Sequence, residues 1–156
     1  MGFNPSTYHT QSYSVPQVVR EVAKFNDLNL RVSNALELGT LQIKTPKRRA
    51  VERVIDVMYH LGEGEALSET DVNVAALALT LKEEGLNPIL VSDDYSIQNL
   101  CEHLGLEYRS LSTLGITHKI LWRLYCPACR RVYESGKSCP VCGTKLKRRA
   151  WRKAAI

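Results

Sequence analysis

The chain has 156 residues, a net charge of +5 and a composition that is 44% hydrophobic and 24% charged. Such a composition is typical of a globular protein and argues against an intrinsically disordered chain. The sequence has no apolar run of about 18 residues, so we expect no membrane-spanning segment. Its first residues, MGFNPSTYHTQSYS, lack the apolar core of an export signal. We therefore expect a cytoplasmic protein, in which paired cysteines bind metal rather than form disulfides.

Charge is divided unevenly along the chain. Residues 1–117 hold 10 Lys/Arg and 15 Asp/Glu, a net charge of −5, whereas residues 118–156 hold 11 and 1, a net charge of +10. The basic C-terminal part indicates a polyanion as partner, and the acidic body indicates a bound cation such as a metal ion. The alternative for each is a solvated charged surface that serves solubility.

Four helices are predicted from apolar stripes at helical spacing and from their capping residues. They span residues 14–25, 45–62, 67–85 and 95–105. We expect Ser14, Thr45 and Ser68 to cap the first three helices, and Asp71 to complete a capping box with Ser68. Glycines at positions 62, 85 and 105 are expected to end the last three.

Two short strands are predicted around the last of these helices. The stretch NPILVSDD (residues 87–94) is a short apolar run that ends in Asp93 and Asp94, which is typical of a buried strand in a parallel sheet. The stretch LEYRSL (residues 106–111) is expected to be the next strand. Helices that alternate with short apolar strands predict an α/β fold with a parallel sheet and flanking helices.

The cysteines give the most specific signal. Cys126, Cys129, Cys139 and Cys142 form two C-P-x-C pairs separated by nine residues. Two such turns facing each other supply four thiolates in the tetrahedral arrangement that structural Zn²⁺ prefers, and the short insert between them is enough for a hairpin. We therefore predict a zinc ribbon with a closed, structural site, with iron as the alternative metal. The fifth cysteine, Cys101, lies on an apolar helix face and is expected to be a buried, inert thiol.

A basic segment surrounds and follows the cysteines. Lysine and arginine neutralise phosphates, and a tryptophan among them can stack on a base, so we predict that this segment binds a nucleic acid. The candidate binding residues are Arg130, Arg131, Lys145, Lys147, Arg148, Arg149, Trp151, Arg152 and Lys153. The alternative is a solvated charged tail.

Four acidic residues are candidates for a second metal site. Asp93 and Asp94 follow a predicted strand, at the end of a parallel sheet where ligands bind. Asp71 opens a helix, and Glu21 lies on an apolar helix face, where an unpaired charge is costly. Each has a simpler interpretation, as a helix cap or as a partly exposed charge. Together they predict a carboxylate cluster for Mg²⁺ or Mn²⁺.

Several segments resemble the Nob-type PIN-domain endoribonucleases, in their compact archaeal form. They are LSETDVNVAALAL, ILVSDDYSIQNL and the cysteine ribbon that follows, and the resemblance runs from about residue 2 to residue 149. It implies cleavage of precursor small-subunit ribosomal RNA at its 3′ end, with a 5′-phosphate on the downstream fragment. It also implies Mg²⁺ or Mn²⁺ as cofactor and the pre-small-subunit particle, with other assembly factors, as partner. Carried over by position, the catalytic acids are Glu21, Asp71 and either Asp93 or Asp94.

The sequence departs from this family at one point. The family opens with an apolar strand of the form L-D-x-S-A-F, ahead of the segment that GFNPS resembles, and this chain does not contain that strand. Either the start codon was assigned too far downstream, which we favour, or this form lacks one metal ligand and a central strand. The second case would favour a non-catalytic rRNA-binding assembly factor on a degenerate PIN scaffold. A toxin-type PIN nuclease is a third interpretation, which the ribbon makes less suitable.

The expected organisation has four parts. They are a PIN domain at 1–112 without the usual first strand, a linker at 113–122, a zinc ribbon at 123–149 and a basic tail at 150–156.

Overall fold

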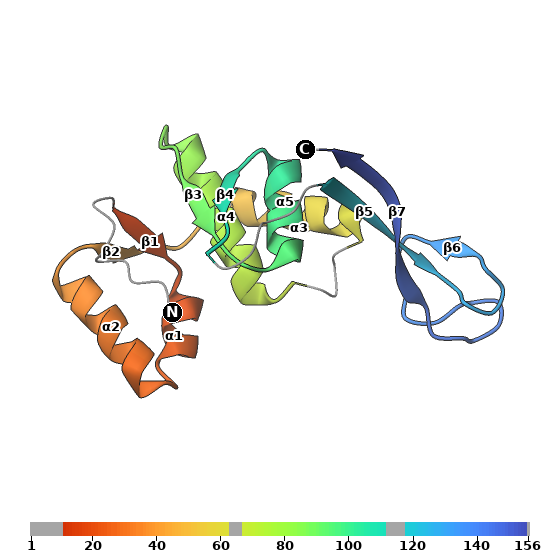
Figure 1. Ribbon diagram of the computed structural model, residues 1–156, viewed down its shortest axis with the longest axis horizontal. Coiled ribbons are helices and arrows are strands. Elements are labelled where there is room, and N and C mark those ends of the chain that lie inside the picture. The colour runs from red at the N-terminus through yellow and green to blue at the C-terminus, as the bar shows by residue number, and fades with distance from the viewer. Residues whose placement is uncertain (1–10, 63–66, 112–117, 156) are drawn as a thin grey trace.

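The computed structural model describes residues 11–62, 67–111 and 118–155, and for 118–121 and 151–155 it describes the backbone alone. The helical part lies at the centre, with the α1–α2 pair on one side and an antiparallel ribbon on the other (Figure 1). In chain order the elements are β1 (Ser12–Ser14), α1 (Pro16–Val22), α2 (Asn26–Glu37), β2 (Leu41–Ile43), α3 (Arg48–Leu61), α4 (Glu69–Glu83), β3 (Ile89–Val91), α5 (Tyr95–Leu104), β4 (Glu107–Arg109), β5 (His118–Tyr125), β6 (Val132–Tyr133) and β7 (Lys147–Ala155).

The strands of the helical part pair in parallel. β1 pairs with β2, with Ser12 opposite Leu41, and α1 and α2 form the connection between them. β3 pairs with β4, with Ile89 opposite Glu107, and α5 makes the crossover. Parallel strands joined through helices confirm the predicted α/β class. In the described residues these strands form two separate two-stranded sheets.

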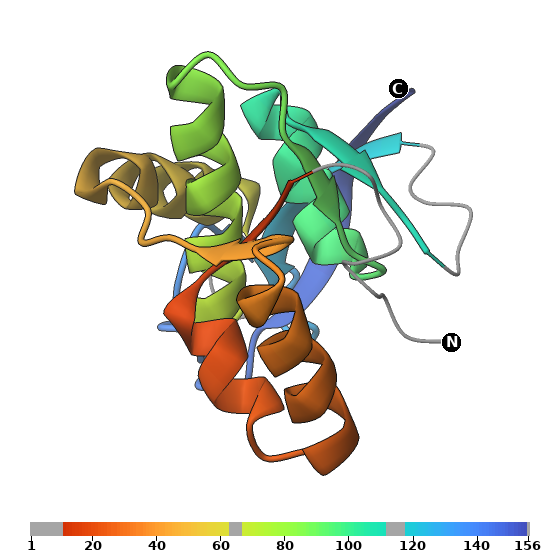
Figure 2. The ribbon, with the colours of Figure 1, turned by 90° about the vertical axis from the view of Figure 1, so that its left-hand side faces the viewer.

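The main core lies where α3, α4 and α5 meet. The alanines of α4 let the helices approach closely, and Ala75 and Ala76 are fully buried. The buried stripes predicted for these helices are confirmed by Val54, Met58, Val72, Ala75, Ala76, Leu79, Ile97, Leu100 and Cys101. The N-terminal strand β1 lies beside α4 (Figure 2). A smaller cluster joins the two, where Val15, which follows β1, packs on Leu77 and Leu81.

Helix ends follow the sequence signals in part. α4 begins with the predicted capping box, in which Ser68 and Asp71 bond each other's backbone amides. Glycines at 62 and 105 lie at left-handed C-caps, as predicted for α3 and α5. Within the described residues, no helix has both the length and the apolar character needed to cross a bilayer.

Two predicted caps are wrong. Ser14 belongs to β1, where its carbonyl accepts from the Lys44 amide at 2.9 Å, so α1 begins at Pro16 without a side-chain cap. Thr45 precedes a buried Pro46, and α3 begins at Arg48, since the Lys47 amide donates to the Thr80 hydroxyl at 3.1 Å. In both cases a bond to another element fixes the chain before the helix begins.

Two further features differ from the sequence-based prediction. β3 is buried only at its centre: Leu90 is 5% exposed, whereas Ile89 and Val91 are 42% and 39% exposed. The helix α2 was not predicted, because its apolar residues do not form a buried stripe; Leu30 is 64% exposed and Ala35 is its one buried residue.

The C-terminal part forms a three-stranded antiparallel sheet in the order β6-β5-β7. β5 and β7 pair from His118 opposite Ala155 to Tyr125 opposite Lys147. The register shifts by one residue between Leu121 and Trp122, which leaves Trp151 as the extra residue of a bulge. The segment expected to be a tail is therefore part of a long strand, and β5 begins inside the expected linker.

Candidate functional site

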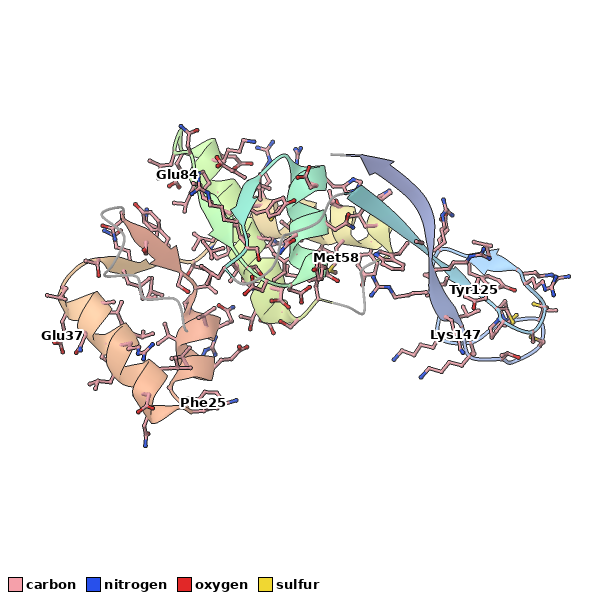
Figure 3. The ribbon with its side chains drawn as sticks, in the orientation of Figure 1. Phe25, Glu37, Met58, Glu84, Tyr125 and Lys147 are labelled. Carbon is pink, nitrogen blue, oxygen red and sulfur yellow. The ribbon has the colours of Figure 1, made fainter. Side chains whose placement is uncertain are left out.

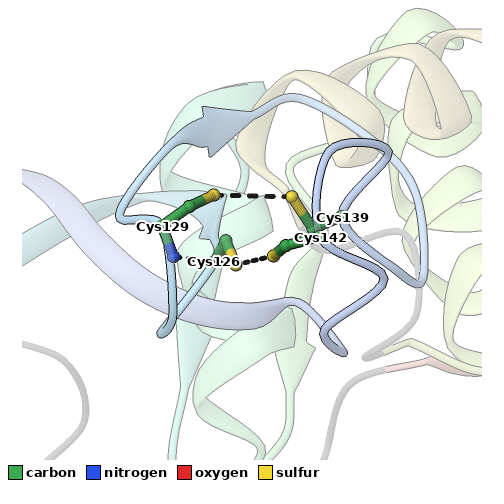
Figure 4. A group of neighbouring side chains, drawn as sticks. All are labelled: Cys126, Cys129, Cys139 and Cys142. Carbon is green, nitrogen blue, oxygen red and sulfur yellow. Dashed lines mark hydrogen bonds between the residues drawn. The ribbon is translucent and has the colours of Figure 1, made fainter.

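The four cysteines lie on two equivalent turns at the far end of the ribbon. In the first turn the Arg130 amide donates to the Cys126 carbonyl, and in the second the Gly143 amide donates to the Cys139 carbonyl, both at 2.9 Å. These bonds fold each C-P-x-C pair so that its two sulfurs face those of the other pair (Figure 4). The sequence prediction that the two pairs come together is confirmed.

The spacing of the sulfurs fits a tetrahedral metal site. All four lie within 4.8 Å of one another, and the closest cross-turn pairs are Cys126–Cys142 at 3.4 Å and Cys129–Cys139 at 3.5 Å. In a tetrahedral site with metal–sulfur bonds of about 2.3 Å, the sulfurs lie about 3.8 Å apart. The sulfurs therefore need to move only slightly to reach the geometry of a metal-bound site. The cluster can therefore hold one metal ion and leaves no open position for substrate.

Hydrogen bonds favour the thiolate form at two of the four cysteines. The Tyr133 hydroxyl lies 3.1 Å from the Cys139 sulfur, and chiefly this bond lowers the pKa of Cys139 to about 6. The backbone amide of Cys129, 3.4 Å from the Cys126 sulfur, is the main cause of a lowered pKa at Cys126. Because metals bind thiolates, these donors prepare the site for a cation.

The predicted acidic residues near the N-terminus lie at the contact of α1 with α4. Asp71 is half-buried and accepts from both the backbone amide and the hydroxyl of Ser68 at 2.8 Å. Glu21 is exposed rather than buried on an apolar face, and it accepts from the Thr70 hydroxyl at 2.6 Å. The structure thus connects Glu21 with the start of the helix that carries Asp71. The expected energetic penalty at Glu21 is absent, because water reaches this carboxylate.

The other two acidic residues lie on the turn between β3 and α5. Asp93 accepts from the Ser110 hydroxyl and, at 2.8 Å, from the Leu111 amide after β4. Asp94 is the N-cap of α5, and its carboxylate accepts from the Ser96 amide at 2.7 Å. Both side chains are exposed, so their mutual repulsion is screened by water as well as by these donors.

The turn is held by a residue that the sequence analysis missed. Gln98 on α5 is fully buried, and its side-chain amide donates to the Ser92 carbonyl at 2.9 Å. The sequence feature that could have identified Gln98 is its place as a polar residue next to Ile97 and Leu100, the apolar positions on the inward face of this helix. Among the described residues, only the four cysteines place three or more ligand atoms within 4.8 Å, so the acids do not form such a group.

The predicted RNA-binding residues are distributed over the ribbon. Arg130, Arg131, Lys145, Lys147, Arg148 and Arg149 are all exposed, whereas the side chains of Trp151, Arg152 and Lys153 lie outside the described residues. Figure 3 shows Lys147 and Tyr125 on the ribbon, away from the helices. The guanidinium of Arg148 lies 4.7 Å from the centre of the Trp122 ring. Arg123 and Tyr125, which were not among the predicted residues, line a hollow of the ribbon together with Arg130 and Arg149.

The lone cysteine is confirmed as a buried thiol. Cys101 is fully buried on α5, and burial, followed by the charge of Glu102, raises its pKa to about 12. It therefore stays a neutral thiol and is not part of the group of four cysteines.

Comparisons with known proteins place the chain in a family. The model of the PIN domain of ribonuclease matches residues 4–81. Endoribonuclease Nob1 of Methanocaldococcus jannaschii is 33% identical over 151 residues, which is 95% of this chain and 72% of the relative. Endoribonuclease Nob1 of Pyrococcus abyssi is 35% identical over 140 residues, 88% of this chain and 83% of the relative. Ribonuclease VapC1 of Thermoplasma acidophilum is 31% identical over 112 residues, 71% of this chain and 55% of the relative. With this coverage, and with the cysteine cluster in place, the chain belongs to the Nob1 family of PIN-domain endoribonucleases.

Proposed function

We propose that this chain is a divalent-metal-dependent endoribonuclease that cleaves precursor small-subunit rRNA at its 3′ end during ribosome assembly. The observation that carries this proposal is the alignment over 151 residues with a protein named Endoribonuclease Nob1. An alignment of this length spans both the helical part and the ribbon. The VapC1 match is shorter, covering 71% of the chain, which supports the Nob1-type role over a toxin-type one.

The proposed catalytic residues are Glu21, Asp71, Asp93 and Asp94, which would hold Mg²⁺ or Mn²⁺ through hard oxygen ligands. Such an ion, when bound, supplies an activated water and neutralises charge that develops on the scissile phosphate. The exposure of Glu21, Asp93 and Asp94 supports this assignment, because a phosphodiester can reach them. A hydrogen bond from Thr70 orients Glu21, and hydrogen bonds from Ser110 and Leu111 orient Asp93.

We propose that the cysteine cluster binds Zn²⁺ as a structural ion. Four thiolates close the coordination shell, so the ribbon is expected to fold on its metal and to serve as a scaffold. The basic residues on this scaffold would hold the rRNA so that the scissile bond lies over the acids. The proposed organisation is a PIN domain at 1–112 followed by a ribbon that runs from β5 to β7. The expected linker at 113–122 and the expected tail at 150–156 therefore overlap its strands. Reduced cysteines and ribosomal RNA as substrate favour the cytoplasm as its compartment.

In the described residues, the four proposed catalytic acids do not form one cluster of ligand atoms. This arrangement is compatible with a second function. Asp71 completes the capping box of α4, Asp94 is the N-cap of α5, and Asp93 and Glu21 accept hydrogen bonds from the Ser110 and Thr70 hydroxyls. This arrangement is also what a non-catalytic rRNA-binding assembly factor on a PIN scaffold would show. The two functions differ in cleavage and agree in RNA binding.

The deciding experiment incubates the protein with a transcript that spans the 3′ end of small-subunit rRNA. The chain is compared with a form extended at its N-terminus by the family's apolar strand and aspartate, each with and without Mg²⁺ or Mn²⁺. We expect cleavage only with the divalent ion, and a 5′-phosphate on the downstream fragment. Binding without cleavage by both forms would favour the non-catalytic function.

A further inference from the structure

We propose that the outward face of the ribbon sheet holds a site for one unpaired RNA nucleotide, with Tyr125 as the stacking platform. The site is a hollow of about 360 Å³, which we call the ribbon hollow. Its lining residues are Arg123, Tyr125, Pro127, Arg130, Val132 and Arg149. The inference rests on the proposed function only in taking RNA as the ligand, and it concerns a different part of the molecule from the acids.

Strand register explains why these residues share a face. Tyr125 lies opposite Val132 of β6 on one side and Lys147 of β7 on the other, and Arg123 lies opposite Arg149. Side chains alternate between the two faces of a sheet, so these residues point away from the metal cluster. The opposite face carries Leu124, Tyr133 and Leu146, which pack around the cysteines. One face therefore serves the metal core, and the other is available for a ligand.

The chemistry of the hollow matches a nucleotide. Tyr125 is half-buried among the apolar side chains of Val132 and Pro127, which leaves an aromatic platform for a base. The guanidiniums of Arg123, Arg130 and Arg149 around it suit a phosphate. One of these three arginines is paired with an acid. The Arg123 guanidinium donates to Glu134 at 2.7 Å, and the Glu134 side chain is 82% exposed. A stacked base needs an open face, which single-stranded RNA offers and a duplex does not.

The backbone at Arg130 adds an independent observation. Arg130 and Gly143 occupy the same position after their C-P-x-C pairs, with φ of 59° and 70°. Glycine adopts a positive φ freely, as Gly143 does, whereas arginine is strained there. Among the described residues, Arg130 is the one non-glycine residue with positive φ. An arginine in a position suited to glycine is explained if its guanidinium binds a ligand at the hollow.

The first test compares an unpaired with a paired RNA, using the zinc-loaded full chain and fluorescence anisotropy without Mg²⁺ or Mn²⁺. The probes are a labelled oligouridine and a blunt duplex of the same length. Tyr125→Leu keeps the apolar bulk and removes the ring, so affinity for the single strand should fall about tenfold. The affinity of Tyr125→Leu for the duplex should stay within about twofold of the wild-type value. Tyr125→Phe keeps the ring and should bind both probes within about twofold of the wild type.

The second test uses Arg130→Gly, which removes the guanidinium and relieves the backbone. We expect weaker single-strand binding and a salt dependence that is shallower by about 0.7 log units per log unit of salt. The melting temperature should stay the same or rise, which a merely structural arginine would not produce. Lys137→Gln is the matched control, because Lys137 is an exposed cation of the same ribbon that does not line the hollow. This control should leave the salt slope unchanged.

Three results would overturn the proposal. They are wild-type affinity of zinc-loaded Tyr125→Leu for the single strand, equal weakening of both probes by this variant, or an unchanged salt slope in Arg130→Gly. If Tyr125→Leu does not load zinc, Arg130→Gly decides the question alone. Both tests measure RNA binding, so their results do not depend on whether the protein cleaves rRNA. Failure of the nucleotide-site proposal would therefore leave the proposed cleavage activity to be decided by the cleavage assay.

Discussion

At the scale of single residues, the cysteine cluster is surrounded by hydrogen-bond donors that the C-P-x-C spacing does not reveal. The spacing predicts which four sulfurs converge, and the structure brings all four within 4.8 Å. It gives no indication that Tyr133 donates to Cys139, because that contact depends on the pairing of β6 with β5. Local motifs encode ligands well, whereas the groups around the ligands come from tertiary structure.

Removal of the Tyr133 hydroxyl should weaken metal binding. Tyr133→Phe deletes the donor 3.1 Å from the Cys139 sulfur and keeps the ring that packs on the cluster. Groups that hydrogen-bond a metal ligand typically contribute tenfold or more, so we expect zinc affinity to fall about tenfold in a chelator competition. Tyr125→Phe, which removes a hydroxyl on the opposite face, is the control and should bind zinc like the wild type. Equal affinities in all three proteins would contradict this role.

At the scale of elements, the helices of the main core were predicted from a buried stripe and at least one correct end signal. α3 and α5 end at the predicted glycines, and α4 begins with the predicted capping box. α2 was missed because its apolar residues form no buried stripe; Leu28 and Leu30 are exposed. The part of β7 from residue 150 onward was interpreted as a tail, because KRRAWRKAA has charges on both faces, which hides the period of two. Its partner β5 defines it as a strand, through pairing that local sequence does not contain.

The cap of α4 allows the stability and catalytic roles of Asp71 to be separated. Ser68→Ala removes one half of the capping box, so the free energy of unfolding should fall by about 1 kcal/mol while cleavage persists. Asp71→Asn keeps an oxygen acceptor for the Ser68 amide, so it should cost less stability but abolish cleavage. Urea denaturation and the rRNA cleavage assay, applied to both variants, provide the comparison. Full activity in Asp71→Asn would remove Asp71 from the proposed catalytic set.

At the scale of the whole molecule, the ribbon is joined to the helical part through a close backbone contact. β5 packs against α3 and α5, and Gly62 at the end of α3 lies against the backbone of Trp122. A Cβ built at Gly62 would lie 2.5 Å from the Trp122 carbonyl oxygen. This contact fixes the direction in which β5 leaves the helices, and through it the position of the proposed RNA-binding face relative to the acids.

Gly62→Ala should therefore destabilise the protein through its inter-element contact. Gly39→Ala is the matched control, since both glycines have φ of 70° and the space at Gly39 is open. The control should cost about 1 kcal/mol from the left-handed backbone alone. Gly62→Ala adds a clash with a backbone atom and should cost about 3 kcal/mol in urea denaturation. Equal costs for the two variants would show that the contact contributes nothing.

The acidic site was only partly predictable. The sequence identified Asp93 and Asp94 as the residues after β3, and the structure places both on the exposed turn before α5. It did not predict that Ser110 and Leu111, after β4, would donate to Asp93, because the parallel pairing of β3 and β4 brings them there. The catalytic role proposed for these acids rests on the family resemblance.

The central claim is that these acids make the chain an endoribonuclease, and one measurement tests it most directly. Cleavage of precursor small-subunit rRNA in Mg²⁺ or Mn²⁺ is compared between the N-terminally extended protein and its Asp93→Asn, Asp94→Asn double variant. Asparagine is nearly isosteric and caps α5 as well as aspartate does, so fold, zinc content and RNA binding should persist. Asp27→Asn, at an exposed acid in the first turn of α2, is the control. We predict that the double variant does not cut while the control cuts like the wild type. Equal cutting by the double variant would contradict the account.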